Sequence, residues 1–229
     1  MLVTLDKASK GRGGAALPPI TARFRSGAVT LVAAETERRP AVLALIASGR
    51  MHPDAGEVRI DGAIDNGQLR RKVAIIDAPE VNDPVGEVPL SAVVAEELMF
   101  AGKVSHPIAV GRMLTTFKAT EWARTAIADV PPTVRIHVLT ELAVLRAGVE
   151  GLVLTAPDRH GGDPLEWWAI SRGLARRGLA VLVVSGTTAK RVIDAMDAEA
   201  ELAAAGDFEP TAVDPAPRAS DTSDSEVQQ

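Results

Sequence analysis

Hydrophobic and polar residues alternate at two places near the N-terminus, which predicts half-buried strands at residues 2–5 and 20–24. Residues 57–60 and 72–76 have the composition of two further strands, and Asp61-Gly62 supplies a turn after the first of them.

Between these strands lies an uninterrupted apolar run at residues 28–34, the pattern of a strand covered on both faces. Residues 40–48 then predict a helix, because Pro40 stands in its first turn and Gly49 follows its end. A strand, a tight connection and a helix follow each other in the same order around a phosphate-binding loop.

Apolar positions at helical spacing dominate the middle of the chain, residues 84–146. The helices predicted there cover residues 90–101, 121–128 and 137–146. The final third returns to strands at residues 152–155 and 180–185 and helices at residues 164–177 and 189–205. Apolar strands that alternate with long helices predict an α/β fold with a parallel sheet and helices packed on it.

Composition and charge narrow the function classes. Hydrophobic residues make up 46% of the 229, cysteine is absent, and four scattered histidines show no metal-ligand spacing, so we expect no metal site. Neither a membrane span nor a signal peptide is recognisable, which predicts a cytoplasmic protein. Residues 206–229 hold six acids and one base, which accounts for the net charge of −5. The nearly neutral body argues against nucleic-acid binding, and the acidic tail is predicted to be disordered.

A longer pattern connects the first strands and the helix. After Gly49 come the turn and strand residues Pro53, Asp54, Gly56, Glu57, Val58, Asp61 and Gly62. With this spacing, residues 29–62 resemble the opening of the ATP-binding subunits of ABC transporters. The resemblance implies a P-loop NTPase-like α/β fold of the ABC-ATPase type. It implies a parallel-sheet core, a small N-terminal antiparallel β part and a helical subdomain at about residues 84–146, all within a domain of residues 1–205.

The loop that would hold phosphate departs from the family pattern. Such a loop uses glycines for close backbone approach, a lysine for the β and γ phosphates and a hydroxyl group for Mg²⁺. By resemblance, the corresponding positions in this chain are Ala34, Glu37, Arg38, Arg39, Pro40, Ala41 and Val42. Glu37 and Arg39 stand in place of glycines, and Pro40 stands in place of the lysine. Arg38 and Arg39 leave open the binding of an anion at the helix N-terminus, although a solvated turn is the favoured interpretation.

Further departures follow along the chain. Ala78 comes after a strand where the family has a glutamine that contacts metal. Thr155 and Ala156 end the strand that normally delivers two carboxylates, one for Mg²⁺ and one for the attacking water. Gly186 stands at the position of a switch histidine. Asp163 matches the end of the family's D-loop and is a D-loop-like position by resemblance alone.

Several polar and aromatic residues have two interpretations. Asp158, His160 and Asp163 suggest a catalytic or metal cluster, but polar residues in a glycine-rich loop more often form turns, so turn formation is favoured. Met99 and Phe100, in the apolar segment 90–102, are candidate contacts with a partner. For the pair at 167 and 168 we expect one tryptophan in the core, and Trp167 is a further candidate for partner contact.

The departures predict a chain that keeps the fold without catalytic residues. We expect an assembly or regulatory partner of a membrane permease or of an intact ABC ATPase, peripheral to the membrane only through that partner, with a homo- or heterodimer left open. No cofactor is expected. The alternative is a divergent subunit that still binds and hydrolyses ATP with Mg²⁺, and a third is that the altered pocket takes another small ligand.

Overall fold

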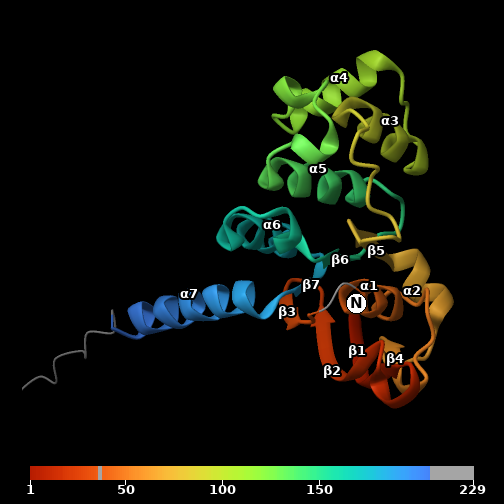
Figure 1. Ribbon diagram of the computed structural model, residues 1–229, viewed down its shortest axis with the longest axis vertical. Helices are drawn as coiled ribbons and strands as arrows, with labels where there is room; N and C mark the ends of the chain where they lie inside the picture. Colours follow the sequence, from red (N-terminus) through yellow and green to blue (C-terminus); the bar gives the residue numbers. More distant parts are fainter. Residues whose placement is uncertain (36–37, 207–229) are drawn as a thin grey trace, which may run out of the picture. The chain divides into compact units, whose positions relative to one another are not determined.

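The computed structural model describes residues 1–35 and 38–206 (Figure 1). Residues 1–195 form one compact unit. The helix α7 (Thr187–Gly206) carries the chain into a second unit, of which residues 196–206 are described. The predicted disordered tail, Gly206 apart, and Glu37 of the predicted phosphate loop lie outside the described residues.

The first unit contains two sheets. The antiparallel sheet has the order β2 (Leu17–Arg25), β1 (Leu2–Lys10) and β4 (Ala55–Ile60). The parallel sheet has the order β3 (Val29–Ala33), β7 (Ala180–Ser185), β6 (Gly151–Thr155) and β5 (Val73–Ile76). The predicted α/β class with a parallel core and a small N-terminal antiparallel part is confirmed.

Burial explains why the parallel strands read as continuous apolar runs. Every residue of β5, β6 and β7 is buried, because helices cover both faces of the sheet. On one face, α1 (Arg39–Ala47) places Leu43 and Ile46 in the core that joins the two sheets. On the other, α6 (Pro164–Arg176) contacts β3 and β7, and α5 (Pro132–Val144) contacts β5.

The helical segment at about residues 84–146 is present as expected, with different elements inside it (Figure 1). It contains α3 (Leu90–Phe100), α4 (Pro107–Thr116) and α5, joined by the 3₁₀ turns η2 (Thr120–Trp122) and η3 (Ile127–Asp129). The pattern did not predict α4, nor the short α2 (Asn66–Lys72), whose first turn is capped by Asp65.

The prediction of a helix at residues 121–128 is wrong. The backbone there turns outward to pair with the start of α3, since Leu90 N donates to Thr125 O at 2.9 Å and Ser91 N donates to Ala123 O at 3.0 Å. A continuous helix would pair Ala123 O with Ile127 N, but here Ile127 N donates to Val88 O at 2.9 Å instead. The next helix, α5, begins at Pro132 instead of residue 137, because proline is well accepted in a first turn.

Gly56 allows β1 and β4 to pair across an irregularity. The register shifts between Asp6 and Ser9, and Lys7 there has a positive φ of 47°. Gly56 lies opposite with a φ of 76°, and a Cβ atom at this position would lie 2.3 Å from Lys7 O. No side chain fits that space without moving backbone.

We therefore expect Gly56→Ala to lower the free energy of unfolding by more than the control Gly27→Ala. Gly27 has a φ of 81° with nothing within 4 Å of the added Cβ, so its substitution carries only the conformational cost of about 1–2 kcal/mol. The clash at Gly56 should add at least about 1 kcal/mol. Urea unfolding followed by circular dichroism measures both, and equal losses would contradict the steric explanation.

Candidate functional site

The carboxyl ends of the parallel strands gather the positions that resemblance marks as the nucleotide site. Ala34 follows β3 and Ala156 follows β6. Ala34 N donates to Ser185 O at 3.0 Å, and Ala156 N donates to Val184 O at 2.7 Å, so both segments continue alongside β7 beyond the sheet. Gly186 follows β7 at the same edge. The fold thus places residues more than 100 positions apart in one region.

A hollow of about 400 Å³ lies at this edge and is called here the strand-end hollow. It is lined by Ala34, Glu35, Pro40, Pro79, Ala156, Asp158, Arg159 and Gly186. Four of these, Ala34, Pro40, Ala156 and Gly186, are nucleotide-site positions by resemblance, and Asp158 was a further candidate from the sequence. The walls consist mainly of alanine, proline and glycine, so they offer few polar groups to a ligand.

The remaining predicted positions do not line the hollow. Ala78 is fully buried, and its N–H donates to Asn82 Oδ1 at 2.9 Å. Thr155 is buried within β6, and Ala41 lies in the core. None of the three lines the hollow, because each packs into the protein interior.

The predicted positions on the phosphate loop and at the starts of α1 and α6 do not line the hollow either. Arg38 is exposed, Arg39 is half-buried, and neither lines the hollow. Val42 packs against the core. Asp163 caps α6, since its Oδ1 accepts a hydrogen bond from Leu165 N at 2.9 Å. Asp163 therefore has a helix-capping role in this chain.

Two carboxylates of the chain occupy the polar rim of the hollow. Asp158 Oδ2 accepts from Gly186 N at 2.9 Å, and Glu35 Oε1 accepts from Thr187 N at 2.9 Å and from the Thr187 hydroxyl. The hydrogen bonds from the Thr187 hydroxyl and N–H lower the pKa of Glu35. These amides open helix α7, where the helix dipole favours negative charge. The protein's own carboxylates therefore bind the donors that would attract an external anion.

The residues of the hollow do not fit Mg-ATP. Pro40 has neither a side-chain cation nor a backbone N–H to offer a phosphate. Among the described residues that line the hollow, Arg159 is the only cation, and its Nη2 already lies 3.0 Å from Asp77 Oδ1. Glu35 and Asp158 would repel a triphosphate.

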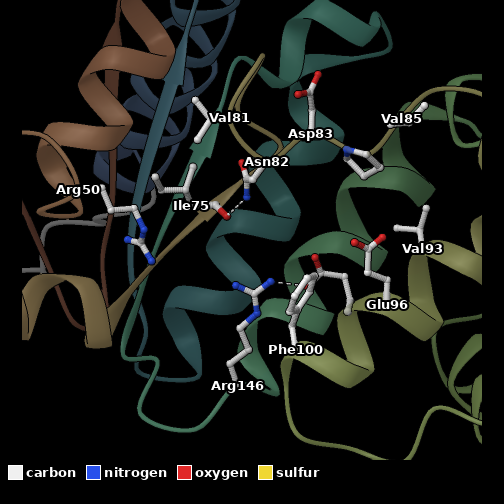
Figure 2. A pocket seen from close by; sticks show the side chains of 12 residues that line it. Arg50, Ile75, Val81, Asn82, Asp83, Val85, Val93, Glu96, Phe100 and Arg146 are labelled. Atoms are coloured by element: carbon white, nitrogen blue, oxygen red, sulfur yellow. Dashed lines mark hydrogen bonds and ion pairs between the residues drawn. The ribbon is translucent and has the colours of Figure 1, made fainter.

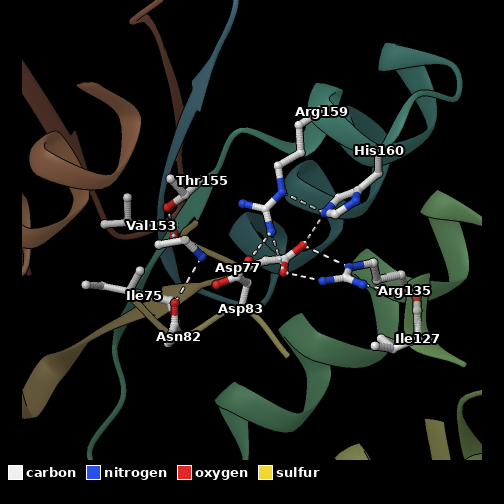
Figure 3. A network of polar contacts seen from close by, with 11 residues as sticks. Ile75, Asp77, Asn82, Asp83, Ile127, Arg135, Val153, Thr155, Arg159 and His160 are labelled. Carbon is white, nitrogen blue, oxygen red and sulfur yellow. Dashed lines mark hydrogen bonds and ion pairs between the residues drawn. The ribbon is translucent and has the colours of Figure 1, made fainter. Parts of the chain in front are cut away.

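Next to the hollow, a buried ion cluster surrounds Asp77, directly after β5 (Figure 3). Arg135 of α5 binds Asp77 with two nitrogens, Nη2 to Oδ1 at 2.7 Å and Nε to Oδ2 at 3.0 Å. His160 Nε2 lies 2.7 Å from Asp77 Oδ2. Arg159 bridges Asp77 to Asp83, whose Oδ2 lies 3.4 Å from Nη2. The cluster connects the sheet, the helical segment and the 3₁₀ turn η4 (Pro157–His160).

The electrostatics of the cluster favour an ionised Asp77. The side chains of Asp77 and Arg135 are only 2% and 4% exposed. Burial alone would raise the pKa of Asp77, but the hydrogen bonds from His160 and Arg135 and the charges of Arg135 and Arg159 outweigh it and hold this pKa well below its usual range. Such a pair tolerates the loss of neither partner.

Sequence reasoning missed this cluster. The sequence pattern does not single out Asp77, and for His160 it favours turn formation over a place in a polar cluster. A usable signal was present in α5, where Arg135 stands one helical turn before the apolar Val138 and Leu139. An arginine on the apolar face of a helix requires a buried acid, and Asp77 follows a wholly apolar strand.

The fold of this chain is similar to the folds of several solved structures. An ATP-binding subunit of an ABC transporter matches with a TM-score of 0.56 at 20% identity, over 83% of this chain and 82% of that chain. The dimeric structure of a bacterial ABC transporter cassette gives 0.61 at 16% identity, over 82% and 90%. CbiO1 from Clostridium perfringens, part of an ABC transporter complex, gives 0.56 at 13%, over 80% and 77%. No family model and no curated protein matches the sequence.

This chain has the fold of an ABC transporter ATP-binding cassette. At these identities the likeness establishes the fold alone. Within the cassette fold, the strand-end hollow lies at the carboxyl edge of the parallel sheet, where open α/β sheets bind ligands. No helix among the described residues is long and apolar enough to cross a membrane.

Candidate partner contacts of this cassette-fold chain divide into two groups. Met99 and Phe100, at the end of α3, are 62% and 65% exposed, so they remain candidates. Trp167 is 2% exposed, and the prediction that it contacts a partner is wrong. Trp168 is buried as well, so both tryptophans pack between α6 and its neighbours.

We expect Asp77→Ala to lower the free energy of unfolding at neutral pH by about 3–5 kcal/mol, because Arg135 is left buried without its counter-charge. The control Asp194→Ala removes the exposed pair with Lys190 within α7 and should cost about 0.5 kcal/mol or less.

The folded pKa of Asp77 is depressed, so the contribution of Asp77 to stability is present above the unfolded pKa of about 3.9 and is lost as the pH falls through the folded value. Urea unfolding should thus show the gap between wild type and Asp77→Ala narrowing from about pH 5 to pH 2. A constant gap would mean that ionisation of Asp77 contributes nothing.

Proposed function

We propose that this chain is a non-catalytic subunit with the cassette fold. In this proposal it acts as an assembly or regulatory partner of a membrane permease or of an ABC ATPase with an intact site. The observation that carries the proposal is the strand-end hollow, where Glu35 and Asp158 bind the amides of Gly186 and Thr187 and where Pro40 stands in place of a lysine. A site arranged in this way has no need of a nucleotide or a metal.

The size of the rate contributions that the replaced groups would make supports a loss of ATP hydrolysis. Phosphoryl transfer depends on positioned charges, and a single arginine finger is worth roughly 10³–10⁵ in rate. Here the lysine, both strand-end carboxylates and the switch histidine are replaced together, by Pro40, Thr155, Ala156 and Gly186. Rescue of all these contributions by neighbouring groups is not supported, because Asp77, Glu35 and Asp158 are already engaged.

Partnership is supported by the kind of structures that resemble the chain and by its surface. One similar structure is dimeric, and another is described as part of a transporter complex. Met99 and Phe100 form an exposed apolar end of α3, and aromatic residues are favoured at contact hot spots. We propose that this end of α3 contacts the partner and that the chain reaches the inner face of the membrane through it.

Calorimetric titration with Mg-ATP should give no saturable binding stronger than about 1 mM, a limit that corresponds to about 4 kcal/mol of binding free energy. Steady-state assays should detect no phosphate release. A catalytically competent cassette measured in parallel is the positive control. Saturable binding that is lost in Arg39→Ala would instead support a divergent ATP-binding subunit and would contradict this proposal.

For the partner, we expect a permease or an intact ABC ATPase to co-purify in a fixed stoichiometry from membranes extracted with mild detergent, with identity established by mass spectrometry. The double variant Met99→Ser and Phe100→Ser should reduce the recovered partner at least about tenfold, in line with a hot-spot loss of roughly 2 kcal/mol. Ile64→Ser changes a comparably exposed apolar residue and should have no effect. Undiminished recovery with the double variant would exclude α3 as the contact.

A further inference from the structure

The connection between α3 and α4 exposes apolar side chains to solvent. Val104 lies in this connection and is 64% exposed, and Ile108, in the first turn of α4, is 65% exposed. Helix α4 buries its opposite face through Val110 and Leu114 and packs against α3 and η2. It lies on the side of the helical segment that faces away from the two sheets (Figure 1). The face of α4 that carries Ile108 is therefore open to a surface outside the chain.

Two basic residues accompany these apolar ones. Lys103 is exposed next to Val104, and Arg112 is exposed one helical turn after Ile108, on the same face of α4. The ion pairs formed among the described residues include neither Lys103 nor Arg112. We call Lys103, Val104, Ile108 and Arg112 the α4 tip.

The acids nearest to the tip in the sequence are directed elsewhere or lie beyond the other end of α4. Residues 98–120 contain neither aspartate nor glutamate. Of the two acids that precede them on α3, Glu97 pairs with Arg146 at 2.5 Å, and Glu96 lines the cavity between α3 and β5, as Figure 2 shows. Glu121 follows the C-terminal end of α4, in η2. The tip is therefore a local positive region on a chain whose net charge is −5.

We propose that the α4 tip binds the surface of a membrane that contains anionic lipids. Lys103 and Arg112 contact lipid phosphate groups, and Val104 and Ile108 enter the boundary between headgroups and acyl chains. The tip has no aromatic side chain on which a base could stack, so a lipid surface fits it better than a nucleic acid. This contact goes beyond the proposed function, in which a protein partner brings the chain to the membrane, and it does not depend on that partner.

The test is flotation of the purified full chain with vesicles in the absence of any partner protein. Vesicles of phosphatidylcholine mixed with phosphatidylglycerol should bind the chain at least about tenfold more tightly than phosphatidylcholine alone, since each basic residue near an anionic surface contributes roughly fivefold. Salt should weaken this binding, because it screens exposed charges. Equal binding to both vesicles, or binding to neither, would overturn the proposal. The failure of the partner to co-purify would leave this result unchanged, so the two proposals fail separately.

Charge variants locate the binding surface. Lys103→Glu combined with Arg112→Glu should reduce binding to the level of phosphatidylcholine vesicles. Arg23→Glu combined with Arg25→Glu changes the net charge equally at two exposed arginines of β2 and should alter binding less than about twofold. Equal losses in the two double variants would mean that net charge and not the tip determines binding. A DNA oligonucleotide in excess should leave the chain on the vesicles, and displacement would point to a nucleic-acid surface and overturn the proposal.

A fluorescent label tests whether the apolar residues enter the membrane. The chain has no cysteine, so Val104→Cys gives a single position for an environment-sensitive fluorophore. Its emission should move to shorter wavelength on anionic vesicles, whereas the same label at Ile64→Cys, where the native side chain is 59% exposed, should not respond. Ile108→Ser should weaken vesicle binding at least about fivefold, because it removes apolar surface that the lipid would cover. Vesicle binding with no change in emission at position 104 would overturn the proposal.

Discussion

The buried carboxylate of Asp77 sets the constraint on which the arrangement of residues 1–195 depends. A charge with a 2% exposed side chain has to be neutralised inside the protein, and Arg135, Arg159 and His160 do so from α5 and η4. Because these donors come from separate segments, one charge fixes the helical segment and the strand-end turn to the sheet. The ion cluster therefore gives the site region a definite geometry, beyond the apolar packing beneath it.

In the strand-end hollow, too, charged groups are bound by other groups of the same chain. The amides of Gly186 and Thr187 lie at the N-terminus of α7, a place where anions bind readily, and Asp158 and Glu35 provide the anions from within the chain. Arg159 belongs to both places, since it lines the hollow and binds Asp77. Polar groups that could serve a ligand at this edge of the sheet thus make internal contacts instead.

The sequence alone determined the parallel sheet, because strands buried on both faces need uninterrupted apolar runs such as residues 180–185. The identities of the residues at the strand ends can likewise be read from the sequence, in register with the strand and the helix. Only the tertiary structure decided the pairing of Asp77 with Arg135 and Arg159, which lie 58 and 82 positions away. It also decided the burial of Trp167 and the replacement of a helix at residues 121–128 by pairing with α3. Local sequence patterns reflect which side of each segment is exposed to solvent. The partner of a buried charge or of an extended backbone segment depends on the packing of segments that are distant in the sequence.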